Sequence, residues 1–211
     1  MKPGSGLDRR GLVAAVLRHR GDAAVIAGLG SPAWDCHAAG DSPLNFYFWG
    51  AMGGASMLGL GVALTRPRRR VLVITGDAEL LMGIGSLATI AAQAPANLSI
   101  LALDNEAFGE TGRQAGLTGK STDIAAMARG AGIRTAFTVV RDGAQGSAVA
   151  TASNVLAPAL FKLPGPVVCV AKVDLTTEPS SFPPREGPLL RDRFRAALSS
   201  GGPTDRSRLR G

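Results

Sequence analysis

The chain has 211 residues and is 45% hydrophobic, which is enough to bury the core of one globular domain. No apolar run reaches the roughly 18 to 20 residues that a membrane-spanning helix needs, so we expect no membrane contact. The net charge of +7 comes from the two ends, because residues 1–22 carry +3, residues 185–211 carry +4 and the part between them is neutral. This distribution excludes a nucleic-acid-binding groove along the core.

Short apolar runs alternate with longer amphipathic or small-residue runs along the chain. In chain order, the pattern predicts a helix at 12–19, a strand at 23–30, a polar loop at 31–43, a helix in the later part of 46–64, a strand at 68–77, a helix at 80–94 that Pro95 closes, a strand at 98–105, a helix at 121–132, a strand at 135–140, a helix at 144–161 and a strand at 166–173. A linker at 175–184, a short helix at 189–198 and a disordered tail at 199–211 are expected to follow.

Strands that are apolar throughout and separated by helices favour parallel pairing, with helices on both faces of the sheet. We therefore expect an α/β fold with a doubly wound parallel sheet in a single domain. The predicted boundaries are an N-terminal helix in 1–22, the domain itself in 23–175, and a linker, helix and basic tail in 176–211.

The two cysteines, Cys36 and Cys169, are far apart in the sequence and have no metal-ligand spacing. We expect neither a disulfide nor a metal site from them, and Cys169 belongs to a predicted strand. The N-terminus also lacks the uninterrupted apolar stretch of a signal peptide. The expected compartment is the cytoplasm.

Two neighbouring predicted strands end in oxygen-bearing side chains. Asp77 follows the strand at 71–75, and Asn105 follows the strand at 98–104. One crossover helix separates these strands, so their carboxyl ends are expected to lie side by side, where α/β sheets bind ligands. Carboxylate, amide and carbonyl oxygens suit Mg²⁺ or Ca²⁺, and a glycine with a following helix N-terminus suits a diphosphate. The alternative is that Asp77 caps the next helix and Asn105 makes a turn.

The stretch GDAELLMGIGSLATIAAQAPANLSILALDN, residues 76–105, resembles the thiamine-diphosphate motif, which begins Gly-Asp-Gly and ends Asn-Asn just under thirty residues later. Upstream, residues 46–64 resemble the segment of these enzymes that holds the aminopyrimidine ring of the cofactor. The resemblance covers residues 23–175. It implies a thiamine-diphosphate-binding fold with thiamine diphosphate and Mg²⁺ as cofactors.

The resemblance also implies a role for individual residues. Mg²⁺ would be bound by the side chains of Asp77 and Asn105 and by the backbone carbonyl of Ala107. The diphosphate would lie along Gly76, Ala78 and Glu79, and Gly109 would lie near the cofactor. The Gly50 carbonyl would accept a hydrogen bond from the pyrimidine amino group, and Met52 would wedge beneath the two rings and hold the cofactor bent; a core filler is the alternative for Met52.

Three positions depart from the family pattern. Ala78 replaces the second glycine of Gly-Asp-Gly, which a negative φ would allow. Glu79 brings an acid near the diphosphate, so we expect its side chain to point away. Asp104 replaces the first asparagine of Asn-Asn and leaves the expected ligand, Asn105, unchanged.

The polar segment at 106–120 is expected to line the reactive end of the cofactor. Glu110 and Thr111 are candidates for contact with the substrate, and Arg113 or Lys120 could bind an anionic tail. His37, in the predicted loop after the first strand, is a candidate acid–base group. Each of these side chains is also compatible with solvent-exposed surface.

Enzymes of this family need a glutamate from a second, pyrimidine-binding (PYR) domain, for which this sequence has no room. The resemblance therefore implies the diphosphate-binding half alone, active with a separate PYR subunit in a 2α2β or larger heteromer. Stand-alone halves of this size most resemble β subunits of sulfopyruvate and phosphonopyruvate decarboxylases, which release CO₂ from a small anionic 2-oxo acid and leave an aldehyde.

Three alternatives remain open. Two keep the cofactor: a carboligase of the acetolactate synthase type, and the β half of a 2-oxoacid oxidoreductase. The oxidoreductase needs iron–sulfur clusters, and the two isolated cysteines of this chain argue against a cluster here. The third is not an enzyme but a degenerate half-domain with a regulatory or structural role.

Overall fold

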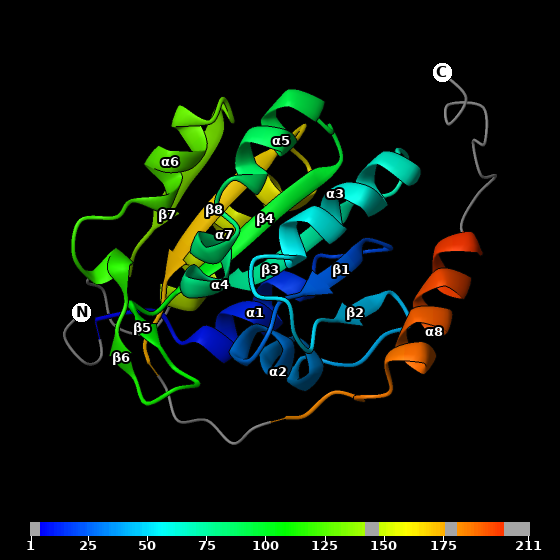
Figure 1. The fold of residues 1–211 in the computed structure, drawn as a ribbon, viewed down its shortest axis with the longest axis horizontal. Coiled ribbons are helices and arrows are strands. Elements are labelled where there is room, and N and C mark those ends of the chain that lie inside the picture. The colour runs from blue at the N-terminus through cyan, green and yellow to red at the C-terminus, as the bar shows by residue number, and fades with distance from the viewer. Residues whose placement is uncertain (1–4, 142–147, 176–180, 201–211) are drawn as a thin grey trace.

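The computed structural model describes residues 5–141, 148–175 and 181–200. Its centre is a sheet of six parallel strands in the order β2-β1-β3-β4-β8-β7 (Figure 1). The strands are β1 (Ala24–Ala27), β2 (Asn45–Tyr47), β3 (Val71–Gly76), β4 (Leu98–Asp104), β7 (Thr135–Val139) and β8 (Val167–Lys172). The inner strands are buried on both faces, as their uninterrupted apolar sequences predict. The expected α/β doubly wound fold is confirmed.

Helices cover both faces of this sheet (Figure 1). One hydrophobic cluster joins the sheet to α1 (Arg9–Leu17), α2 (Ser31–Ala38) and α7 (Ala148–Phe161). The other joins it to α3 (Ala55–Thr65), α4 (Asp77–Met82), α5 (Ser86–Gln93) and α6 (Ile124–Gly130). The remaining elements are the hairpin of β5 (Ala107–Phe108) and β6 (Gln114–Ala115), the 3₁₀ turn η1 (Leu117–Gly119) and α8 (Gly187–Ser199).

Segments from both ends of the chain pack onto this core. Leu7 forms a parallel bridge with Val173, which brings the start of α1 to the end of β8. At the other edge, Figure 1 shows α8 beside β2, where the ring of Phe194 lies 5.5 Å from that of Phe46. The N-terminal helix therefore reaches the carboxyl edge of the sheet, where ligands bind in such folds.

The structure corrects the prediction of a loop at 31–43. Residues Ser31–Ala38 form α2, and Asn45–Tyr47 form the edge strand β2. The helix begins after Gly30, whose φ of 76° favours glycine, and Pro32 lies in its first turn. The mixed composition of α2 gave no clear helical periodicity, and three residues are too few for β2 to show alternation.

The predicted helix at 80–94 is wrong as a single element, because it is two helices, α4 and α5, separated by residues 83–85. A Cβ atom at Gly83 would lie 2.3 Å from the carbonyl oxygen of Gly53, so the two backbones are in direct contact there. This contact sets the end of α4 against the Gly50–Gly53 turn.

The other predicted elements lie close to their expected positions. Asp123 caps α6 by accepting a hydrogen bond from the backbone N–H of Ala126. Cys36 and Cys169 are free thiols, both buried, as expected. The start of the predicted helix at 144–161, part of the linker and nearly all of the predicted tail lie outside the described residues. Within the described part of the chain, no helix has both the length and the hydropathy to span a bilayer.

Candidate functional site

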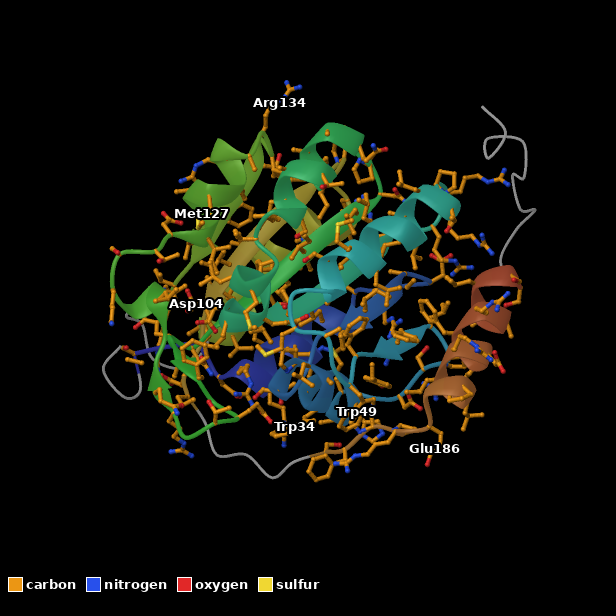
Figure 2. The ribbon with its side chains drawn as sticks, viewed as in Figure 1. Trp34, Trp49, Asp104, Met127, Arg134 and Glu186 are labelled. Atoms are coloured by element: carbon orange, nitrogen blue, oxygen red, sulfur yellow. The ribbon has the colours of Figure 1, made fainter. Side chains whose placement is uncertain are left out.

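The candidate site lies at the carboxyl edge of the sheet, between β3 and β4. These strands pair with Gly76 opposite Leu103, so Asp77 and Asp104 follow as neighbours. Both carboxylates contact one hydroxyl: Thr118 Oγ1 in η1 lies 2.9 Å from Asp77 Oδ2 and 2.7 Å from Asp104 Oδ1. Figure 2 shows Asp104 at this edge, near the β5–β6 hairpin. The expected convergence of the two strand ends is therefore observed.

Negative charge accumulates at this edge. Burial, together with the charge of Asp104, raises the pKa of Asp77 to about 6. On its other side, Asp104 forms an ion pair with Lys172 at 2.8 Å, and Lys172 also contacts Glu106 at 2.7 Å. Burial lowers the pKa of Lys172, but its hydrogen bonds to these two carboxylates outweigh that effect and raise it. Lys172 therefore neutralises the Asp104 side of the edge, and it has no contact with Asp77 among the described residues.

The two structural alternatives for Asp77 and Asn105 have different outcomes. Gly76, and not Asp77, is the N-cap of α4, and Asp77 is the first helical residue. Asn105 does make a turn, because its Oδ1 accepts the backbone N–H of Ala107 at 3.0 Å. An amide oxygen has two lone pairs, so this turn leaves one for a further ligand. Glu106, inside the turn, has a φ of 60°, a strained conformation for a non-glycine residue.

Most of the predicted site residues line one cavity at this edge. Its wall contains the predicted residues Met52, Gly76, Asp77, Ala78, Glu79, Asn105, Ala107, Gly109, Glu110 and Thr111. Ala78 lies within α4, where φ is negative, so its methyl group fits in place of the family's glycine. The structure thus brings together the end of β3, the loop after β4 and the turn before α3.

The turn that carries Met52 is held in an unusual backbone conformation. Ala51 has a φ of 53° and Gly53 a φ of 87°. Met52 itself is 40% exposed and lines the cavity, so it is not a core filler. Gly50 is exposed and does not line the cavity.

The carboxylate of Glu79 is buried and bonded to the protein. It accepts hydrogen bonds from Thr75 Oγ1 and, at 3.4 Å, from the backbone N–H of Ala55 at the start of α3. A Cβ atom at Gly28 would lie 1.9 Å from it, so Glu79 fills the space above that glycine. Burial raises the pKa of Glu79, although these hydrogen bonds oppose the shift. The residue ties α4 to β3 and α3.

His37 does not join the site. It is the penultimate residue of α2, where Nδ1 lies 2.8 Å from Ser181 Oγ and the ring packs edge-on against Tyr47. The prediction that it belongs to a loop is wrong, and it is absent from the cavity wall. Arg113 and Lys120 are exposed and also do not line the cavity.

Three polar residues of this region were missed by sequence reasoning. Thr118 links the two carboxylates, Lys172 pairs with Asp104, and Arg9 lines the cavity from the first turn of α1. Lys172 could have been predicted, since it lies at the end of a predicted strand and therefore at the ligand-binding edge of the sheet. Thr118 and Arg9 had none, because their places depend on a short 3₁₀ turn and on the packing of the N-terminal segment.

The donor set at this edge fits a hard divalent cation. The single proton of the Thr118 hydroxyl serves only one of the two carboxylates at a time, so the other receives no hydrogen bond from Thr118. A cation beside Asp77 relieves that deficit, and the Asn105 amide and the Ala107 carbonyl offer further oxygens. Within the described residues, no three His, Cys, Asp or Glu side chains form a metal-binding group. The protein ligands would thus be one carboxylate, one amide and one carbonyl, with phosphate oxygens completing the shell.

An open parallel sheet with a cavity at its carboxyl edge, into whose wall Asp77 and Asn105 bring oxygen atoms, defines an α/β domain that binds a ligand at its strand ends. The chain belongs to the family described as thiamine pyrophosphate enzyme, C-terminal TPP binding domain, which matches residues 32–171. The match covers β2, β3, β4, β7, β8 and the cavity residues that follow β3 and β4.

Curated relatives match part of the chain. The chain is 48% identical over 93 residues, 44% of its length and 50% of the relative's, to the sulfopyruvate decarboxylase subunit beta of Methanothermobacter thermautotrophicus. It is 40% identical over 142 residues, 67% of its length and 35% of the relative's, to the phosphonopyruvate decarboxylase of Streptomyces viridochromogenes. The matches thus span between about a third and a half of these two relatives.

Solved structures support the fold. A 4-hydroxybenzoylformate decarboxylase of Rhodococcus jostii, described as thiamine diphosphate-dependent, superposes with a TM-score of 0.61 at 20% identity, over 82% of this chain and 34% of the other. At this identity the likeness concerns the fold alone.

Proposed function

We propose that the chain is the diphosphate-binding subunit of a thiamine-diphosphate-dependent decarboxylase that acts on small anionic 2-oxo acids. The observation that carries the proposal is the meeting of Asp77, Asn105 and Ala107 at one cavity, in a member of a thiamine-pyrophosphate-binding family. The relatives named sulfopyruvate and phosphonopyruvate decarboxylase support a substrate with a second anionic group.

In this proposal Asp77, Asn105 and the Ala107 carbonyl hold Mg²⁺, and the start of α4 binds the diphosphate. The first N–H groups of a helix are free to donate, and its dipole favours an anion. Met52 contacts the cofactor rings from the turn that Gly53 and Gly83 fix. When bound, thiamine diphosphate supplies the electron sink that accepts the bonding electrons as CO₂ leaves a 2-oxo acid.

The chain's own groups then set the geometry and exclude water. Leu29, Leu103 and Phe108 give the cavity an apolar wall. In such a wall, charges are screened less than in water, so fixed donors act more strongly on the reacting groups. The activating glutamate belongs in this proposal to a separate PYR subunit, consistent with the name "subunit beta" of one relative.

Two measurements test the proposal. Calorimetry should detect thiamine diphosphate binding in the presence of Mg²⁺ and the PYR subunit, and the binding should be lost in EDTA. The assembled complex should then release CO₂ from sulfopyruvate or phosphonopyruvate faster than from pyruvate. If the cofactor fails to bind with or without the PYR subunit, the chain is a degenerate half-domain. If it binds but only carbon–carbon ligation is seen, the chain belongs to a carboligase.

A further inference from the structure

Arg9 is a buried cation in the wall of the candidate cavity. Its side chain is 5% exposed, although it belongs to the first turn of an N-terminal helix. It shares the cavity with Ser31 and Pro32, the first residues of α2, and with Glu110. A buried arginine on a cavity wall is unusual unless its charge is compensated, so the surrounding charges decide what it can do.

Part of that compensation comes from Asp35 in α2, which is fully buried. Arg9 donates to it through Nε and, at 3.5 Å, through Nη2, while Arg10 donates from Nε at 3.1 Å. Two guanidinium groups, both always charged, thus share the Asp35 carboxylate, so Arg9 does not have this carboxylate to itself. Among the described residues, Nη1 of Arg9 has no hydrogen-bond partner. Arg9, which lines the cavity, therefore keeps one nitrogen of its guanidinium group without a partner among the described residues.

A second carboxylate that interacts with Arg9 is Glu110. A Cβ atom at Gly30 would lie 2.8 Å from Glu110 Oε1, which places this carboxylate over the start of α2. Burial raises the pKa of Glu110, and the charge of Arg9 opposes that shift. Glu110 belongs to the segment after β4 and is exposed as a residue, so its carboxylate occupies this place while it is only partly shielded from solvent.

The cavity is therefore polarised. At one part of its wall, Asp77 with Asp104 behind it favours a cation, and at another Arg9 and the N-terminus of α2 favour an anion. A guanidinium forms paired hydrogen bonds with carboxylate, sulfonate or phosphonate oxygens, and these bonds are strong in a partly dehydrated site.

We propose that Arg9 binds the second anionic group of the substrate, the sulfonate or phosphonate, and so selects doubly anionic 2-oxo acids. The inference rests on the proposed function and deepens it by naming a specificity residue. It also replaces Arg113 and Lys120, the cations that the sequence suggested for this contact. Glu110 lies beside the same donors and competes with the anion for them.

The alternative is that Arg9 only ties α1 to α2 through Asp35. Arg10 provides a matched control, because it donates to the same carboxylate but does not line the cavity. A purely structural role predicts similar effects for R9Q and R10Q. Anion binding predicts an effect of R9Q alone.

The test measures binding of 3-sulfopropanoate, which lacks the reacting carbonyl, to the full chain by calorimetry, with propanoate as the singly anionic control. R9Q should weaken 3-sulfopropanoate binding roughly tenfold to a hundredfold, because a bond to a charged group is lost. R10Q should change it little, and E110Q should strengthen it. Melting temperatures of the variants show whether each still folds.

The outcomes separate this inference from the proposed function. If Mg²⁺ and thiamine diphosphate bind but R9Q and R10Q affect 3-sulfopropanoate equally, or neither affects it, the Arg9 assignment is overturned and the cofactor assignment stands. If the cofactor does not bind but R9Q alone weakens 3-sulfopropanoate, the anion site stands and the proposed function fails. In the assembled complex, R9Q should raise the KM for sulfopyruvate far more than that for pyruvate; equal increases would contradict the inference.

Discussion

At the residue scale, the candidate site depends on one hydroxyl group, that of Thr118, which faces two carboxylates and can donate to only one of them at a time. Thr118 contacts Asp77 and Asp104 with one hydroxyl, and Lys172 pairs with Asp104 and Glu106 but not, among the described residues, with Asp77. Asp77 is thus the carboxylate left for a cation, and its place at the first residue of α4 sets it beside the N–H groups expected to bind a diphosphate.

The first prediction concerns Asp77 itself. D77N keeps the size of the side chain and removes the charge that Mg²⁺ needs, so Mg²⁺-dependent binding of thiamine diphosphate should be lost while the melting temperature stays within a few degrees of the parent value. Calorimetry and circular dichroism measure the two effects. Retained cofactor affinity in D77N would show that the metal lies elsewhere.

The second prediction concerns Thr118. T118V leaves two buried carboxylates without their shared donor and should lower the free energy of unfolding by about 1–3 kcal/mol, whereas T118S should stay close to the parent. Urea denaturation measures both. Equal stability of all three proteins would mean that the hydroxyl contributes nothing to holding η1 against the sheet edge.

At the element scale, close backbone packing fixes where helices end and how near they approach the sheet. In α3, a Cβ atom at Gly59 would lie 2.3 Å from a Val73 methyl group of β3, whereas a Cβ atom at Gly61 meets nothing within 4 Å. Gly59 therefore permits the close contact between α3 and the sheet, and Gly61 does not take part in it.

This difference gives a matched pair of substitutions in one helix. G59A should destabilise the chain by about 1–3 kcal/mol through overpacking. G61A should stabilise it by about 0.5–1 kcal/mol, because alanine is the better helix former. Thermal and urea denaturation of both variants check this. Stabilisation by G59A would contradict the described packing of α3 on β3.

Elements with strong patterns could be predicted from the sequence, and those fixed by tertiary contacts could not. The uniform apolar runs of β3, β4 and β8 identify buried parallel strands directly. The break between α4 and α5 depends on Gly83 meeting Gly53, thirty residues earlier, which local periodicity does not reveal. Likewise, the start of α2 depends on the positive φ of Gly30, directly before Ser31, which local periodicity does not reveal either.

The site follows the same rule. The position of Asp77 and Asn105 at the ends of neighbouring strands was predictable, because they follow strong strands and match a known spacing. Arg9 and Thr118 were not, since Arg9 reaches the cavity, and Thr118 reaches the two carboxylates, from elements with no sequence link to this edge. His37 was placed wrongly for a related reason: its helix was taken for a loop, and a residue at the far end of α2 points to Ser181 instead.

At the scale of the whole molecule, the cavity is bordered by apolar side chains that remain in contact with solvent. Met52, Met82, Phe108 and Leu117 are 40, 65, 36 and 52% exposed. These side chains come from the Met52 turn, the end of α4 and the segment after β4, all at the carboxyl edge of the sheet. Such a border suits the proposed PYR subunit, which would complete the cavity.

This arrangement predicts the effect of a charge at the border. M82E should abolish assembly with the PYR subunit and leave the chain folded, because a carboxylate would be buried unpaired in the interface. L64E is the control. Leu64 is also exposed, at 48%, but it lies near the C-terminal end of α3, at the opposite end of this helix from the Met52 turn. Analytical ultracentrifugation of the mixtures distinguishes them. Normal assembly of M82E would place the interface on another face.

The metal site is tested most directly by a crystal structure of the chain grown with thiamine diphosphate and Mn²⁺, with the ion located by its anomalous scattering. We expect one ion bound directly to an Asp77 carboxylate oxygen, the Asn105 amide oxygen and a diphosphate oxygen at about 2.0–2.3 Å. An ion bound away from both side chains, or a cofactor bound with no ion between it and Asp77, would show that these residues do not hold the metal.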